Sequence, residues 1–170
     1  ITNDCYWNAG PDAAYWNGQR IHVSTATNLT ANDWLLVPSR SHRSYDITFA
    51  GKTRGFGSLA AHICYVARNI APGALIDQTH LWDIAAGTAI LHAAGGVVVT
   101  LPYGQELTMR SLLDGRTTDS SLIVAAPALV PDWLGCIQVR KEATPRAAMN
   151  ATVVSSSAPA PRADDPDALA

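Results

Sequence analysis

The amino-acid sequence predicts an α/β fold, a layered sandwich of mixed sheets and helices. Short apolar stretches of strand length alternate with segments in which apolar residues recur at helical spacing, and this alternation is typical of α/β layers. The 170 residues are 48% hydrophobic, which is enough to bury the core of one modest domain. The pattern holds to about residue 140 and then stops.

The first 24 residues are expected to form short strands joined by turns. Asn17-Gly18 lies between apolar residues, and this dipeptide is the strongest short-range signal of a β-hairpin. Further along, residues 34–37 form a continuous apolar run that ends at Pro38, so they are expected to be a buried strand. The polar segment 39–43 then opens a loop or a short helix.

Helices and strands alternate from residue 58 onward. Ser58 can cap a helix, because the apolar residues after it recur on one stripe as far as Ile70. Small residues around Gly87 would let a second helix lie very close to a neighbour. In chain order the expected elements are a helix from Ser58 to before Pro72-Gly73, a strand over 74–76, a helix from about Asp83 to Ala94, strands over 97–100 and 121–126, and a helix over 128–138.

Beyond Lys141 the composition changes. The last 30 residues contain nine Ala, four Pro and almost nothing large to bury, so too little apolar area is available to offset the entropy of ordering them. The sequence therefore predicts a folded portion over 1–140 and a disordered tail over 141–170.

Charge and hydropathy exclude two classes of partner. Twelve Lys and Arg against 14 Asp and Glu give a formal net charge of -2, so no broad positive field would attract nucleic acid. No apolar run approaches the roughly 18 to 20 residues that span a bilayer, so a membrane is not expected as a partner either. Three cysteines without C-x-x-C spacing suit neither a disulfide framework nor a zinc site, and they favour a cytoplasmic location.

Residues 55–60 read Gly-Phe-Gly-Ser-Leu-Ala and match the dinucleotide-binding pattern G-x-G-x-x-G/A, with Asp77 downstream. That fingerprint needs a buried apolar strand before its first glycine. The preceding residues, 50–54, are too polar for the central strand of a doubly wound sheet. A nucleotide-cofactor domain is therefore the weakest of the hypotheses considered.

The strongest motif is Trp-Asp-Ile-Ala-Ala-Gly over residues 82–87, followed by Ala-Gly-Gly over 94–96. An Asp at a helix start can simply cap free backbone N–H groups. Here, however, an aromatic residue before Asp83 and small residues after it would pack the helix start tightly against its surroundings. A carboxylate held in that way can face a metal or phosphate cleft.

This motif resembles the second signature of the inositol monophosphatase-like, magnesium-dependent phosphatases. Two earlier segments are similar to that family in the same order: residues 17–24, Asn-Gly-Gln-Arg-Ile-His-Val-Ser, and residues 57–61, Gly-Ser-Leu-Ala-Ala. The resemblance covers about residues 1–139. It implies the layered α/β architecture of the sugar phosphatases and Mg²⁺ as the cofactor.

The resemblance also implies roles for individual residues. Asp83 would be a metal ligand and a catalytic residue that helps to orient the attacking water, and Gly57 and Ser58 would contact the substrate. Residues 39–42, Ser-Arg-Ser-His, resemble a stretch of the nucleotide-phosphatase branch, which implies a substrate contact for His42. The inositol-phosphate branch has a Glu seven residues before the motif Asp, and Ile76 stands there in this chain.

The family's first signature, D-P-x-D-G-T, supplies most of its metal ligands and does not occur in these 170 residues. We therefore expect the C-terminal half of a Mg²⁺-dependent phosphomonoesterase, whose N-terminal half is needed for a complete site. The substrate would be a small phosphorylated metabolite: an inositol phosphate, a related sugar phosphate or a nucleotide phosphate. A homodimer is one assembly that the resemblance allows. The alternative is a non-catalytic protein of the same fold that binds a ligand or a partner.

Overall fold

The computed structural model describes residues 3–140, and the predicted tail over 141–170 lies outside the described residues. The elements are β1 (Tyr6–Asn8), β2 (Ala14–Trp16), β3 (Gln19–Ile21), β4 (Trp34–Leu36), α1 (Ser41–Ser44), β5 (Tyr45–Ile47), β6 (Lys52–Arg54), α2 (Leu59–Ala67), β7 (Gly73–Ile76), α3 (Leu81–Ala93), β8 (Val97–Thr100), η1 (Met109–Leu112), β9 (Leu122–Ala125), η2 (Pro127–Leu129), α4 (Val130–Cys136) and β10 (Ile137–Val139). Strands and helices alternate as the sequence predicts.

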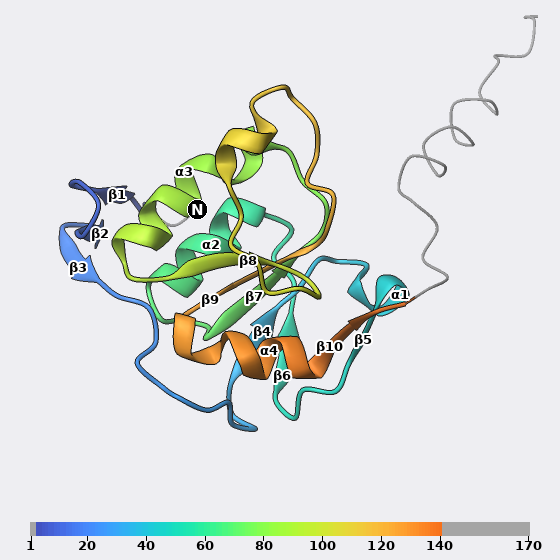
Figure 1. Cartoon of the computed structure of the whole chain (residues 1–170). Coiled ribbons are helices and arrows are strands. Elements are labelled where there is room, and N and C mark those ends of the chain that lie inside the picture. The colour runs from blue at the N-terminus through green and yellow to red at the C-terminus, as the bar shows by residue number, and fades with distance from the viewer. Residues whose placement is uncertain (1–2, 141–170) are drawn as a thin grey trace, which may run out of the picture. The chain divides into compact units, whose positions relative to one another are not determined.

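These elements stack in layers (Figure 1). A five-stranded sheet of order β6-β4-β7-β9-β8 has α2 and α3 on one face and α4 on the other. A second sheet, β1-β2-β3, packs on the far side of α3. In the larger sheet β6, β4 and β7 are parallel, whereas β9 is antiparallel to both β7 and β8. The predicted α/β class with mixed sheets is confirmed.

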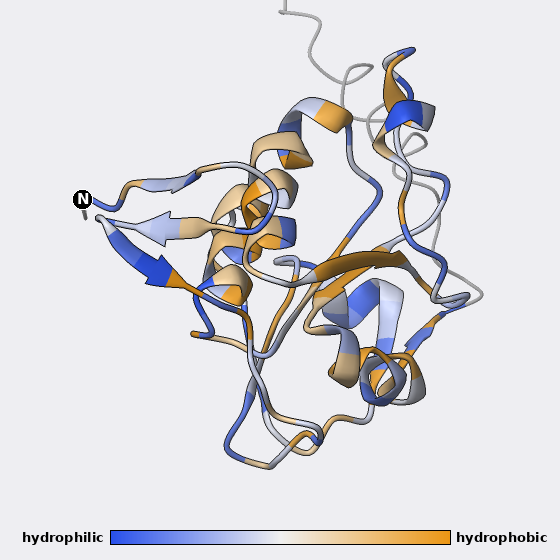
Figure 2. Cartoon of the chain, turned by 60° about the vertical axis from the view of Figure 1, so that its left-hand side comes forward, coloured by the Kyte–Doolittle hydropathy of each residue, from blue (hydrophilic) through white to orange (hydrophobic). Residues whose placement is uncertain are grey.

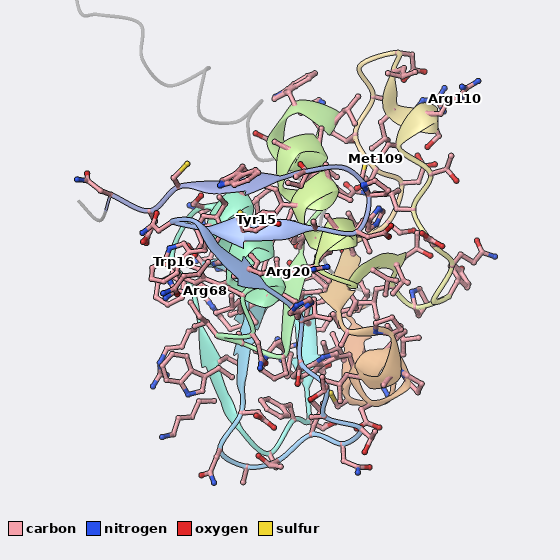
Figure 3. The ribbon with its side chains drawn as sticks, turned by 90° about the vertical axis from the view of Figure 1, so that its left-hand side faces the viewer. Tyr15, Trp16, Arg20, Arg68, Met109 and Arg110 are labelled. Atoms are coloured by element: carbon pink, nitrogen blue, oxygen red, sulfur yellow. The ribbon has the colours of Figure 1, made fainter. Side chains whose placement is uncertain are left out.

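The N-terminal sheet forms where the turn chemistry places it. Trp16 pairs with Gln19 across a two-residue turn, and Asn17 and Gly18 both have positive φ values, 48° and 81°. Such a turn suits Asn-Gly because Asn tolerates the left-handed region and Gly adopts it freely. In Figure 3, Arg68, the C-cap residue of α2, lies by Trp16, with its guanidinium over the indole ring, and this contact ties the sheet to the helix layer.

The hydrophobic core fills the space between the helices and the larger sheet. Every residue of β7 and β9 is buried, and Figure 2 shows hydrophobic residues gathered on the strands between the helix layers. The helices α2 and α3 approach closely at Gly87, where an added Cβ would lie 3.2 Å from the Ile63 side chain. The expected close approach of this helix to a neighbour is confirmed at Gly87, whereas Ala85, Ala86 and Ala89 are exposed.

Three expectations about element bounds are wrong. The second long helix begins at Leu81, with His80 as its N-cap, and not at Asp83. The last helix ends at Cys136, because residues 137–139 pair with β5 as strand β10 and the first of them is buried. Ile70 lies beyond the end of α2 and is 40% exposed, so it is not part of the helix stripe.

Two further observations concern the exclusions made from the sequence. Within residues 3–140, no helix has both the length and the apolar character that crossing a bilayer requires. Cys64 is buried and Cys136 is half-buried, but Cys5 is exposed.

Candidate functional site

The candidate site lies at one edge of the larger sheet. The parallel strands β4, β6 and β7 all end at this edge, and the segments that leave them are 37–40, 55–58 and 77–80. Ligands of open α/β sheets bind outside the carboxyl ends of such strands. The topology therefore brings three segments to the same edge of the sheet. Each of them either contains predicted site residues or leads directly to one.

Asp83 occupies the third position of α3 and is exposed. Trp82 before it is 67% exposed, so the expectation that an aromatic residue packs this helix start against its surroundings is wrong. Its carboxylate does not cap the helix, because no side chain forms a capping hydrogen bond at this N-terminus. Among the described residues its hydrogen-bond partner is the Thr79 hydroxyl, which donates to Oδ2 at 3.4 Å. The carboxylate therefore keeps room for a further ligand, and its negative charge is favourable at a helix N-terminus.

The loop before α3 is anchored from two sides. Thr79 is buried, its backbone N–H donates to the Thr118 hydroxyl at 3.2 Å, and its carbonyl accepts from the Thr118 N–H at 2.9 Å. These contacts hold the residue that bonds to the Asp83 carboxylate. The position of Asp83 is thus set by a segment about 35 residues further along the chain.

Asp77, at the start of the same loop, is already engaged. The Tyr45 hydroxyl donates to its carboxylate and also lies 2.6 Å from the Ser121 hydroxyl. Burial, together with the hydrogen bond to Asp77, raises the pKa of the Tyr45 phenol above its usual value. Tyr45 is buried and the other two are half-buried, and their hydrogen bonds join β5 to the residue after β7 and the residue before β9.

Gly57 and Ser58 lie at the N-terminus of α2. Gly57 has a φ of 73°, and a Cβ there would meet nothing within 4 Å, so its backbone conformation, rather than space, favours glycine. Ser58 is the N-cap as predicted, and its hydroxyl accepts from the Ala61 N–H at 3.3 Å. This helix start follows β6 and so lies at the same sheet edge, and a helix N-terminus is a favourable place for an anion.

His42 lies in the short helix α1, and its side chain is exposed. Its carbonyl accepts from Arg140 at 2.9 Å, and the same guanidinium pairs with Asp46 at 2.6 Å. The structure therefore places His42 near the carboxyl end of β4, with its backbone tied to the strand pair β5–β10. Its contact with a substrate remains a prediction.

Two residues next to these segments were not identified as site residues from the sequence. Thr79 donates a hydrogen bond to Asp83, and the buried His62 accepts the backbone N–H of Phe56 at 3.2 Å. Neither contact has a recognisable sequence signal, because each depends on how a loop folds back on its helix.

Burial lowers the pKa of the His62 imidazole below its usual value. In the unfolded chain this imidazole binds a proton near pH 6.5, whereas in the folded protein it binds one only at lower pH. The free energy of unfolding should therefore fall as pH decreases below about 6.5, by at most about 1.4 kcal/mol per pH unit. Urea unfolding at pH 7.5 and pH 5.0 measures this. His62→Gln should reduce the slope, and an unchanged slope would mean that other groups produce it.

Within residues 3–140, no three His, Cys, Asp or Glu side chains come together as a metal site. Asp83 supplies one hard carboxylate, the type of ligand that Mg²⁺ takes, but Mg²⁺ needs several oxygen ligands. The described residues thus fit one part of a magnesium site.

The sequence is similar to proteins of one known family. The model of the inositol monophosphatase family matches residues 1–134. A fructose-1,6-bisphosphatase/inositol-1-monophosphatase of Aquifex aeolicus is 37% identical over 111 residues, 58% of this chain and 42% of that protein. Nus factor SuhB of Pasteurella multocida is 35% identical over 148 residues, 81% of this chain and 52% of that protein. The chain thus spans about half the length of these relatives.

The solved structures show the same fold. Inositol monophosphatase from Anabaena (Nostoc) sp. PCC 7120 matches with a TM-score of 0.62 at 19% identity, over 78% of this chain and 53% of that one. SuhB from Bartonella henselae matches with a TM-score of 0.62 at 20% identity, over 78% of this chain and 51% of that one. These two matches show the fold, and the family match over residues 1–134 shows that the chain belongs to the inositol monophosphatase family.

Proposed function

We propose that the protein containing this chain is a Mg²⁺-dependent phosphomonoesterase of small phosphorylated metabolites. One observation carries the proposal: the exposed Asp83 carboxylate lies in the first turn of α3, at the same sheet edge as the N-terminus of α2. Membership of the inositol monophosphatase family supports a phosphatase-type function. An anionic phosphate ester suits two helix N-termini that face one edge.

Asp83 would be the ligand that this chain contributes to the metal. Thr79 donates to one of its oxygens and so orients the carboxylate, while Asp77 is less suited because it already accepts from Tyr45. When bound, Mg²⁺ neutralises charge that develops on the phosphate and lowers the pKa of a bound water. The other metal ligands would come from outside the described residues.

Gly57 and Ser58 would bind the phosphate through backbone N–H groups at the start of α2. His42 would contact the organic part of the substrate from the end of β4. Ile76 stands in the position of the Glu of the inositol-phosphate branch, is fully buried and has no polar side-chain group that could bind a substrate hydroxyl. This difference counts against an inositol phosphate, and a panel of inositol, sugar and nucleotide monophosphates tests it.

The 170-residue chain by itself should not hydrolyse phosphate monoesters, because one free carboxylate cannot hold Mg²⁺ ions that need several ligands each. The assay compares the chain with the protein made from its full reading frame, using Mg²⁺ and a panel of inositol, sugar and nucleotide monophosphates. Only the full-length protein should show turnover. Turnover by the 170-residue chain that disappears in Asp83→Ala would show that its site is complete.

A non-catalytic protein of the same fold is the second candidate, favoured by the lack of a three-ligand metal site within residues 3–140. The same assay separates the two. A full-length protein that binds a phosphate ester but does not turn it over would support the non-catalytic function.

A further inference from the structure

The loop of residues 55–58 folds back on the helix that it precedes. The Phe56 N–H donates to Nε2 of His62, in the first half of α2, at 3.2 Å. The Phe56 ring also meets Tyr65 edge to face, with ring centroids 5.6 Å apart. The backbone just before Gly57 and Ser58 is thus attached to α2 at two points.

His62 makes this contact at an energetic cost. Its side chain is 1% exposed, and because Nε2 accepts a hydrogen bond, the neutral ring carries its proton on Nδ1. Among the described residues Nδ1 is buried and has no partner. A buried N–H without a partner destabilises a fold, and an apolar side chain would avoid that cost. What offsets this cost is the hydrogen bond that Nε2 accepts from the Phe56 N–H.

We propose that His62 is a positioning residue, which holds the 55–58 loop in the conformation that binds the phosphate monoester. The inference rests on the proposed function, because it takes Gly57 and Ser58 as substrate contacts. A loop that is ordered before binding does not lose further conformational entropy when the substrate arrives. Losing the His62 contact should therefore weaken substrate binding more than it slows the chemical step.

Three substitutions separate the role of the Nε2 acceptor from that of the size of the His62 side chain. His62→Leu removes both ring nitrogens. His62→Gln places an acceptor near the position of Nε2, whereas His62→Asn reaches only as far as Nδ1. Thr88→Val is the matched control. Thr88 is also buried, and within residues 3–140 its hydroxyl has no hydrogen-bond partner, but it lies in α3 and does not contact the loop through a hydrogen bond.

Steady-state kinetics of the full-length protein with Mg²⁺, and amide hydrogen exchange at Phe56, test the proposal. His62→Leu and His62→Asn should raise KM about tenfold with little change in kcat, the effect of losing one hydrogen bond, and speed Phe56 exchange by a similar factor. His62→Gln should restore both values toward wild type, and Thr88→Val should change neither.

The proposal would be overturned if His62→Leu sped Phe56 exchange but left KM unchanged, or if it lowered only the melting temperature. It would also be overturned if His62→Gln behaved like His62→Leu. A wild-type protein without turnover would contradict the proposed function. Amide hydrogen exchange at Phe56, measured with and without inorganic phosphate, would then decide the role of His62. Slower exchange with phosphate in wild type, but not in His62→Leu, would support the positioning role. Equal slowing in both proteins would contradict the positioning role.

Discussion

Asp83→Asn in the full-length protein is expected to lower the turnover of phosphate monoesters on the order of 100-fold or more, because the transition state loses charge stabilisation from the metal site. The free energy of unfolding should change by no more than about 1 kcal/mol, the scale of a charge at a helix N-terminus. Asp83 is exposed and its carboxylate does not cap α3, so the fold depends little on its charge.

Steady-state kinetics and urea unfolding of the same preparation measure both effects. Asp132→Asn is a matched control, since Asp132 is an exposed aspartate at the third position of α4, on the opposite face of the sheet. It should leave turnover unchanged. Near-normal turnover in Asp83→Asn, together with a loss of several kcal/mol, would make Asp83 a structural residue and remove the main support for a phosphatase.

Trp133→Ala should lower the free energy of unfolding by about 3 to 5 kcal/mol, the usual cost of removing a large aromatic side chain from a core. Trp133 is fully buried, and its ring meets Phe49 edge to face with centroids 4.9 Å apart. It also lies directly against β7, where a Cβ on Gly73 would be only 2.4 Å from the indole nitrogen. This side chain therefore packs directly on the strand that leads to Asp77 and the site.

Chemical unfolding tests this prediction, with Trp82→Ala as the control for loss of a tryptophan. Trp82 is 67% exposed and stacks on His80, so its removal should cost far less. Trp133→Phe keeps part of the aromatic side chain, so its loss in the free energy of unfolding should lie between those of Trp133→Ala and Trp82→Ala. Equal losses for Trp133→Ala and Trp82→Ala would contradict the packing described for α4.

Local chemistry allowed much of the fold to be predicted. The Asn17-Gly18 hairpin, the Ser58 cap and the strands that became β4, β7, β8 and β9 all follow from patterns within a few residues of each other. Helix bounds were less secure. The start of α3 was placed two residues late, because an acidic residue is equally favourable anywhere in the first turn of a helix.

For the candidate site, the sequence by itself determined which residue types could carry the chemistry, namely Asp83 in its small-residue motif and Gly57-Ser58 before a helix. Only the tertiary structure decided that these segments meet at one edge, because the parallel register of β6, β4 and β7 is set by contacts between distant residues. The same holds for Tyr45 bonding to Asp77, Thr79 held by Thr118 and the strand pair β5–β10. Such pairings join residues about 30 to 100 positions apart, and no local pattern of hydrophobicity or turn chemistry specifies which distant partner a polar side chain will meet.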